Sequence, residues 1–282
     1  MRELIGSRVA SQRLSAPGLA TKGPLKPAMP AASVERAELS ERFADVARQV
    51  WVPRWSIPAG QTMLQPVLQY PAVNIVVEPD SAALYLPADG VAERGLTGTS
   101  WAAGLLMRPG AGSLVVPGDH STMLGAVMSV PSSDSLISRL RDTIPAGGPT
   151  DAVVAYETWL EPLLDRVDDD VRLLNAIADA AEQDATVNST RDLVDRFGIS
   201  ERSLQRLFRR RVGRSPRWLI QRRRLQEAAF RLRENLDTGL AELAAELGYA
   251  DQSHFTRDFR KVVGQTPGTY RRALSGSGQR AY

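Results

Sequence analysis

Two stretches near the C-terminus carry arginine and glutamine side chains at the spacing of an α-helix. In the first stretch these candidate DNA contacts are Arg202, Gln205, Arg206 and Arg209; in the second they are Gln252, Ser253, Thr256, Arg257 and Arg260. Residues three or four positions apart share one helix face. Arginine can donate paired hydrogen bonds to guanine, and glutamine can pair with adenine in the major groove. Each stretch could therefore present base-reading groups along one face.

The same two stretches are near copies of one another at an offset of about 51 residues. Each has a glycine that can end a helix, Gly198 or Gly248, and then a residue that can cap the next helix, Ser200 or Asp251. Apolar residues fall on the face opposite the polar row: Leu204, Leu207 and Phe208 in the first copy, and Phe255, Phe259, Val262 and Val263 in the second. The repeat predicts two helix-turn-helix units.

A longer helix is expected between the two copies. Ser215-Pro216 is a capping residue followed by proline at the first helical position, and the apolar spacing continues to about Asn235. Roughly 20 residues span about 30 Å, close to the approximately 34 Å between successive major grooves on one side of DNA. One chain could read two grooves without dimerising. Thr266-Pro267 then predicts a final short helix that packs through Tyr270 and carries Arg271 and Arg272 toward phosphates.

Charge is distributed unevenly along the 282 residues. Residues 186–282 hold 20 lysine and arginine residues against 10 acidic ones, and 19 of the 20 are arginine; residues 151–185 hold 2 against 10. The net charge of the whole chain is only +3. A basic field confined to the repeat favours a nucleic-acid partner for this part of the chain.

The second copy resembles the signature of the AraC/XylS family of bacterial transcription regulators. The similarity lies in GYADQSHFTRDFRK at 248–261, GQTP at 264–267 and Tyr270-Arg271. It extends over about residues 170–274 and implies an all-α domain of seven helices with two helix-turn-helix motifs. It also implies promoter DNA as the partner, with RNA polymerase a candidate second partner. The family's base-reading positions fall on Arg202, Gln205 and Arg206, and on Gln252, Ser253, Thr256 and Arg257.

The preceding part of the chain predicts an α+β protein with a β-rich N-terminal domain. Short apolar runs separated by proline and glycine indicate strands; they are residues 51–57, 63–70, 73–77, 83–86 and 101–107. Helices are expected over 33–49, 132–141 and 152–164, and another is expected to begin at Asp168-Asp169-Asp170. The predicted organisation is a disordered tail (1–40), a β-rich effector or dimerisation domain (41–150), a helical linker (151–169), the DNA-binding domain (170–274) and a tail (275–282).

Members of this family commonly carry a companion domain, often cupin-like, that senses a small molecule or mediates dimerisation. A small organic effector and a second copy of the chain are accordingly candidate partners here. The candidate ligand-binding residues are Trp51, Trp55, Asn74, Trp101 and Arg108, since aromatic area with a few polar groups suits a small-molecule site. The alternative is that the rings fill a small core without leaving a cavity.

Several other classes of protein are disfavoured. The chain has no cysteine and two histidines, so neither a metal centre nor a cofactor is expected, and no nucleophile elbow or phosphate-binding loop suggests catalysis. Without a leader or a membrane-length apolar run, a cytoplasmic protein with no membrane partner is expected. The remaining alternative is an architectural protein that binds DNA without sequence preference; glutamine, serine and threonine among the arginines favour specific reading instead.

Overall fold

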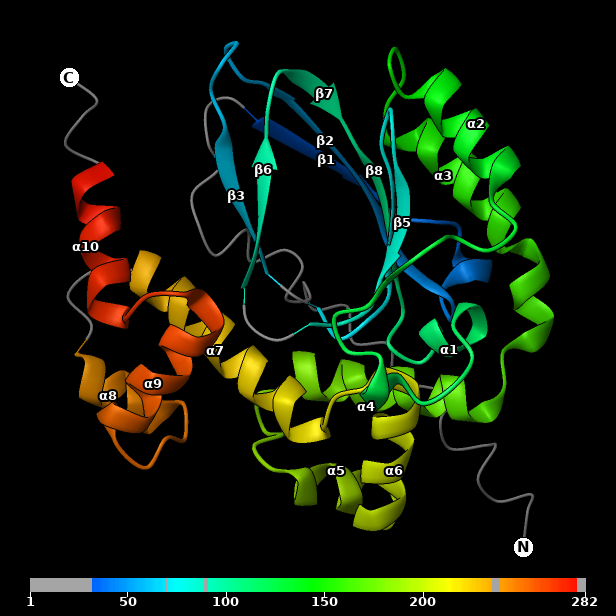
Figure 1. Cartoon of the computed structure of the whole chain (residues 1–282). Helices are drawn as coiled ribbons and strands as arrows, with labels where there is room; N and C mark the ends of the chain where they lie inside the picture. The colour runs from blue at the N-terminus through cyan, green and yellow to red at the C-terminus, as the bar shows by residue number, and fades with distance from the viewer. Residues whose placement is uncertain (1–31, 69, 89–90, 235–238, 278–282) are drawn as a thin grey trace, which may run out of the picture.

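The computed structural model describes residues 32–68, 70–88, 91–234 and 239–277. Its N-terminal half is built on an antiparallel sheet with the strand order β1-β2-β8-β4-β5-β9, and β7 also pairs with β2 (Figure 1). The strands are β1 (Ala32–Ala37), β2 (Ala47–Ser56), β4 (Asn74–Val77), β5 (Ala82–Tyr85), β7 (Thr99–Trp101), β8 (Ala103–Met107) and β9 (Val127–Met128). A separate two-stranded ribbon joins β3 (Met63–Leu68) to β6 (Val91–Leu96).

Both faces of the sheet are covered. Helices α2 (Asp134–Thr143) and α3 (Pro149–Leu160) lie on one face, where the buried Tyr156 donates a hydrogen bond to the Ala103 carbonyl at 2.8 Å (Figure 1). The other face packs Trp55 and Val76 against Leu96 of the ribbon. The strands predicted from the apolar runs are confirmed, since β2, β3, β4, β5, β7 and β8 coincide with them. The runs are apolar because successive side chains point to opposite faces of the sheet, and both faces are covered.

Two expectations for this half need correction. The helix predicted over 33–49 is wrong: β1 and the start of β2 occupy these residues, joined through the short helix η2 (Glu41–Phe43). The tail expected over 1–40 therefore includes β1, while residues 1–31 lie outside the described part. The segment expected as a linker, 151–169, is helical, but α3 belongs to the core of the sheet domain. The helix η4 (Glu161–Arg166) leads from it to the C-terminal half.

The C-terminal half contains seven helices within the described residues. They are α4 (Asp169–Gln183), α5 (Thr190–Phe197), α6 (Glu201–Val212), α7 (Pro216–Glu234), α8 (Leu240–Glu246), α9 (Gln252–Val263) and α10 (Pro267–Ser277). Asp168 caps α4 by accepting a hydrogen bond from the Val171 amide, as the acidic cluster predicted. Helix α10 reaches Ser277, into the expected tail 275–282.

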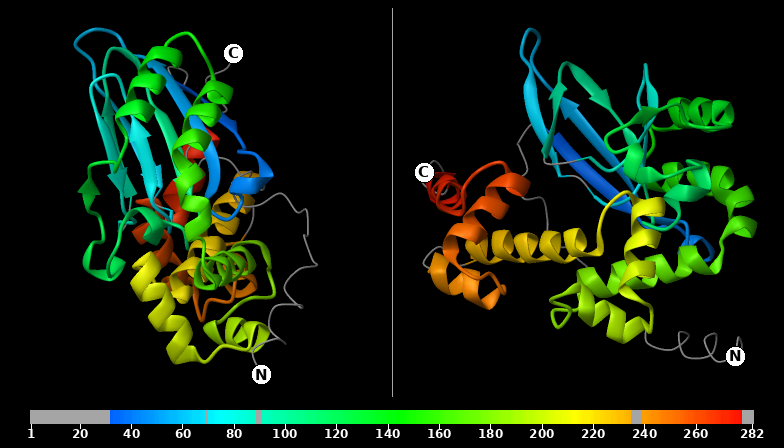
Figure 2. Two further views of the ribbon diagram at one scale, coloured as in Figure 1. Left: turned by 90° about the vertical axis from the view of Figure 1, so that its right-hand side faces the viewer. Right: turned by 60° about the horizontal axis from the view of Figure 1, so that its bottom comes forward.

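Helix α7 contributes to two separate cores. Leu219 and Ile220 pack with α4, α5 and α6, whereas Leu225 and Ala228 pack with α8, α9 and α10. Figure 2 shows α7 as the rod between the two helical units. Across the described residues, no helix combines the length and the hydropathy needed to cross a membrane.

Candidate nucleic-acid interface

The first helix-turn-helix consists of α5 and α6. Ser189 and Asp192 form a capping box at the start of α5, and Gly198 ends it in the left-handed conformation at φ 61°. Ser200 then caps α6 by accepting a hydrogen bond from the Ser203 amide at 3.2 Å. These caps define where α5 and α6 begin, because each satisfies a backbone group that the helix end would otherwise leave unpaired.

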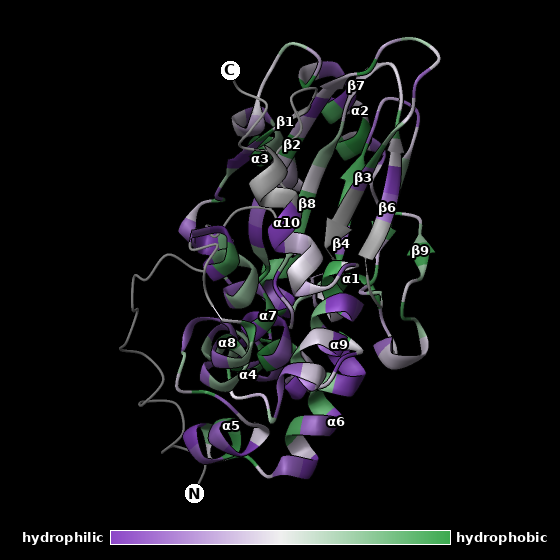
Figure 3. Cartoon of the chain, turned by 90° about the vertical axis from the view of Figure 1, so that its left-hand side faces the viewer, coloured by the Kyte–Doolittle hydropathy of each residue, from purple (hydrophilic) through white to green (hydrophobic). Residues whose placement is uncertain are grey.

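Helix α6 buries one face and exposes the other. Leu204, Phe208 and Val212 are buried in the core shared with α4 and α7. The four candidate contacts are all exposed: Arg202, Gln205, Arg206 and Arg209. Hydrophilic residues accordingly dominate the visible turns of α5 and α6 in Figure 3. The amphipathic division predicted from the sequence is therefore present in the folded helix.

The second helix-turn-helix repeats this construction with α8 and α9. Gly248 has φ 74°, and Asp251 caps α9 by accepting a hydrogen bond from the His254 amide at 2.7 Å. Phe255, Phe259 and Val263 are buried against α7 and α10. On the outer face Gln252, Ser253, Arg257 and Arg260 are exposed, and Thr256 is half-buried.

Four of the outer arginines have no partner in the part of the chain that the structure describes. Among the described residues, the guanidinium groups of Arg202, Arg206, Arg257 and Arg260 form no hydrogen bond or ion pair. Gln205 donates to Glu201 at 3.0 Å, one turn earlier on the same helix. Unpaired guanidinium groups are available to an external acceptor, and base edges and phosphates are acceptors that arginine binds well.

Arg209 differs from the other candidates. Its Nε donates to the Ser121 hydroxyl at 3.1 Å, in the short helix η3 (His120–Thr122) of the sheet domain. Gly213, which ends α6, lies close to the same short helix: a Cβ at this position would lie 2.7 Å from the His120 carbonyl oxygen. The C-terminal end of α6 is thus docked on the sheet domain, while its N-terminal turns are exposed.

Many arginines of the basic field are structural, which the sequence did not reveal. Arg223 donates to the carbonyls of Asp184 and Val187, and Arg224 donates to that of Asn188, so both hold the loop between α4 and α5. Burial lowers the pKa of the Arg222 guanidinium to about 10 despite the opposing effect of Glu182. A run of three arginines therefore serves packing at the centre of α7.

A buried charged cluster joins the two halves of the chain. Arg48 of β2 pairs with Glu182 of α4 at 2.7 Å, and the guanidinium carbons of Arg48 and Arg222 lie 4.9 and 4.8 Å from the centre of the Tyr70 ring. Burial raises the pKa of Glu182, although the three neighbouring arginines, Arg48, Arg222 and Arg108, oppose that rise. The Arg48–Glu182 ion pair thus connects β2 of the sheet domain to α4 of the helical half.

The five candidate ligand residues do not come together. Trp51 and Asn74 are neighbours, and Trp51 Nε1 donates to Asn74 Oδ1 at 3.2 Å; the Trp55 indole donates to the Thr97 carbonyl. Trp101 packs with the core on the opposite face of the sheet. Arg108 pairs with Asp179 of α4 at 2.5 Å. Because these five residues do not line a common space, a pocket must be sought among other residues.

Comparison with known proteins places the similarity in the helical half. A family model described as a helix-turn-helix domain matches residues 193–273. The chain is 35% identical over 79 residues to the transcriptional activator RhaS of Pectobacterium carotovorum, covering 28% of each protein. It is 32% identical over 118 residues to a putative AraC-like transcription regulator of Streptomyces lividans, covering 42% of this chain and 37% of that protein. The matched segments thus span roughly a third of these relatives.

Two solved structures show a distant likeness. A probable AraC family regulator from Rhodopseudomonas palustris is 27% identical with a TM-score of 0.34, covering 38% of this chain and 98% of that one. ToxT from Vibrio cholerae is 14% identical with a TM-score of 0.39, covering 87% of this chain and 98% of that one.

Proposed function

We propose that this chain is a sequence-specific, DNA-binding transcription regulator of the AraC/XylS family, to whose members its C-terminal half is similar. The observation that carries the proposal is the pair of capped units whose outer faces, on α6 and α9, present Arg202, Arg206, Arg257 and Arg260 without a partner among the described residues. Helix α7, at 19 residues, spans about 28 Å between them. That separation suits two successive major grooves.

Each recognition helix contributes both arginine and hydrogen-bonding neutral residues. Arg206 and Arg257 lie at the middle of their exposed faces, flanked by Gln205 or Thr256. Phosphate contacts alone require only positive charge, whereas base edges require donors and acceptors at defined positions. The composition of these faces therefore favours a reader of sequence over an architectural DNA-binding protein.

Competition binding tests the proposal against that alternative. A binding site selected from random DNA should compete at least about a thousandfold better than unrelated DNA of equal length, measured at one fixed salt concentration. Equal competition by both DNAs would identify an architectural protein. Genome-wide mapping of bound sites would then give the promoters it controls.

We further propose that a small molecule modulates DNA binding through the sheet domain. The support is that α6 touches this domain along its C-terminal end, through Arg209 and Ser121 and through Arg211 and Ser113. A change in the sheet domain would therefore act directly on the helix that is proposed to read DNA. An effector that binds the sheet domain should shift DNA affinity in the full chain, which an electrophoretic titration measures.

A further inference from the structure

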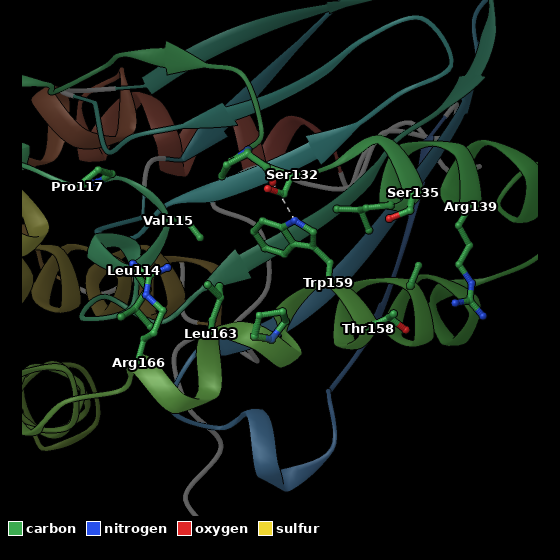
Figure 4. Close-up of a pocket in the computed structure, with 14 residues that line it drawn as sticks. Leu114, Val115, Pro117, Ser132, Ser135, Arg139, Thr158, Trp159, Leu163 and Arg166 are labelled. Carbon is green, nitrogen blue, oxygen red and sulfur yellow. Dashed lines mark hydrogen bonds between the residues drawn. The ribbon is translucent and has the colours of Figure 1, made fainter.

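A groove of about 670 Å³ lies on the helical side of the sheet domain, bounded by α2, α3, η4 and α1 (Gly112–Val115) (Figure 4). Its floor is apolar, with the buried side chains of Leu114, Leu136 and Leu163. The Trp159 ring forms a wall and is fixed by a hydrogen bond from Nε1 to the Pro131 carbonyl at 3.1 Å. This volume and lining fit a small organic molecule.

Two arginines lie at the ends of the groove. Arg139 extends from α2 on one side and Arg166 from the end of η4 on the other (Figure 4). Within the described ranges neither guanidinium has a hydrogen bond or an ion pair, and no carboxylate lines the groove. By contrast, Arg48 and Arg108 of the same domain are each paired with a carboxylate. The groove thus combines an apolar floor with two uncompensated positive charges.

The rim of the groove contains a strained residue. Ser132 has φ 48°, and among the described residues it is the one non-glycine residue with a positive φ. It follows Pro131, whose carbonyl holds Trp159. Left-handed backbone at a serine costs free energy and is retained where the surrounding contacts require it. The strained Ser132 thus lies directly beside the residue that positions Trp159.

We propose that this groove binds an elongated dicarboxylic acid with an apolar middle. Each carboxylate would accept paired hydrogen bonds from one guanidinium, Arg139 at one end and Arg166 at the other. The methylene chain would lie on the leucine floor against the face of Trp159, away from water. The identification of this acid as the effector rests on the proposed function; its binding to the groove does not.

The groove also adjoins the anchor of the first recognition helix. Helix α1 supplies Leu114 to the groove, and the neighbouring Ser113 accepts a hydrogen bond from Arg211 of α6 at 3.3 Å. Arg166 precedes Asp168 by two residues, and Asp168 pairs with the same Arg211. Arg211 of α6 therefore contacts residues near two groove-lining positions, Leu114 and Arg166. A shift of either position on binding of the acid would change the contacts of the first recognition helix.

Isothermal titration of the full chain with saturated diacids, from hexanedioate to dodecanedioate, tests the site without DNA. Affinity should peak at one chain length, and the monocarboxylic acid of that length should bind about tenfold more weakly because one ion pair is lost. Arg139→Gln and Arg166→Gln should each weaken the best diacid by about tenfold. Both arginines are exposed, so the variants should keep the thermal stability of the parent.

Arg94→Gln is the matched control, since Arg94 lies in β6 on the far side of the sheet and pairs with Glu78. It should leave diacid affinity unchanged. No saturable binding at millimolar concentrations, or binding that survives both groove substitutions, would overturn the site. Diacid binding in a chain that fails the DNA competition would support the groove and contradict the proposed function, so the two can fail separately.

Discussion

Arg211 of α6 lies 2.7 Å from a carboxylate oxygen of Asp168, and the other oxygen of the same carboxylate caps α4. One acidic side chain therefore caps the start of α4 and ties the first recognition helix to that helix. Burial raises the pKa of Asp168, but hydrogen bonds from Arg211 and from the Val171 amide outweigh it, so the pKa lies below its ordinary value.

Two substitutions separate the roles of Asp168. Asp168→Ser keeps a capping oxygen and removes the charge, so it should cost only the exposed ion pair, less than about 1 kcal/mol. Asp168→Ala removes both and should cost about 0.5–2 kcal/mol more. Chemical denaturation of the full chain measures both values. Equal losses for serine and alanine would mean that the cap contributes nothing.

Arg206→Ala and Arg257→Ala should each lose about 1–3 kcal/mol of binding free energy at the selected site and relax preference at one base pair. The reason is that each guanidinium is exposed, unpaired among the described residues and central on its helix face. Arg42→Ala, at a sheet-domain arginine paired with Glu161, is the control and should change neither quantity. Unchanged base preferences in both recognition-helix variants would show that the reading faces are assigned wrongly.

Gly213→Ala should destabilise the protein more than Gly198→Ala. Both glycines have positive φ, 77° and 61°, so alanine pays a similar backbone cost of about 1–2 kcal/mol at each. At Gly198 the new Cβ would meet no atom within 4 Å, but at Gly213 it would meet the His120 carbonyl oxygen at 2.7 Å. Thermal denaturation of the two variants compares them. Similar losses would contradict the docking of α6 on the sheet domain.

Stability should fall as the pH drops below about 6.5, because burial lowers the pKa of His120 while the unfolded chain titrates near that value. The hydrogen bond between Nε2 and the Val116 carbonyl and the nearby Asp119 offset only part of this effect. A histidine with a depressed folded pKa leaves the unfolded state with more bound protons, so acid favours unfolding.

His120→Gln should flatten this dependence between pH 7 and about pH 5, because it removes the group whose pKa differs between the folded and unfolded states. Denaturation across that range checks the slope, and an imidazole titration followed by NMR on the unsubstituted protein checks the pKa directly even if the glutamine variant folds poorly. A His120 imidazole that titrates at or above its ordinary value would contradict the prediction.

In the helical half, most of the correct predictions rest on residues that act over a short stretch of sequence. Ser189, Gly198, Ser200 and Asp251 act through backbone groups within a few residues, so their types alone located the helix ends. The helix predicted over 33–49 failed for the opposite reason. Strand β1 exists because its backbone pairs with β2, for example Val34 with Pro53, and that partner is not visible in the local pattern.

The contacts that tie the two halves together were not predictable for the same reason. Arg48 and Glu182 are 134 positions apart, and nothing in either neighbourhood distinguishes them from surface charges. Arg139 and Arg166 look like ordinary solvated residues on helices until the fold places them at one groove. The sequence therefore predicted the exposed polar faces of α6 and α9, which depend on periodicity, but not the groove, which depends on tertiary packing.

The central claim is that α6 and α9 occupy successive major grooves at once, and changing the spacing within the selected DNA site tests it most directly. With the two sub-sites about 10 bp apart, the full chain should bind tightly; inserting about 5 bp turns one sub-site to the opposite side of the duplex. After the insertion, the affinity should fall to that measured for DNA with one sub-site alone. Undiminished affinity after the insertion would contradict simultaneous docking of the two helices.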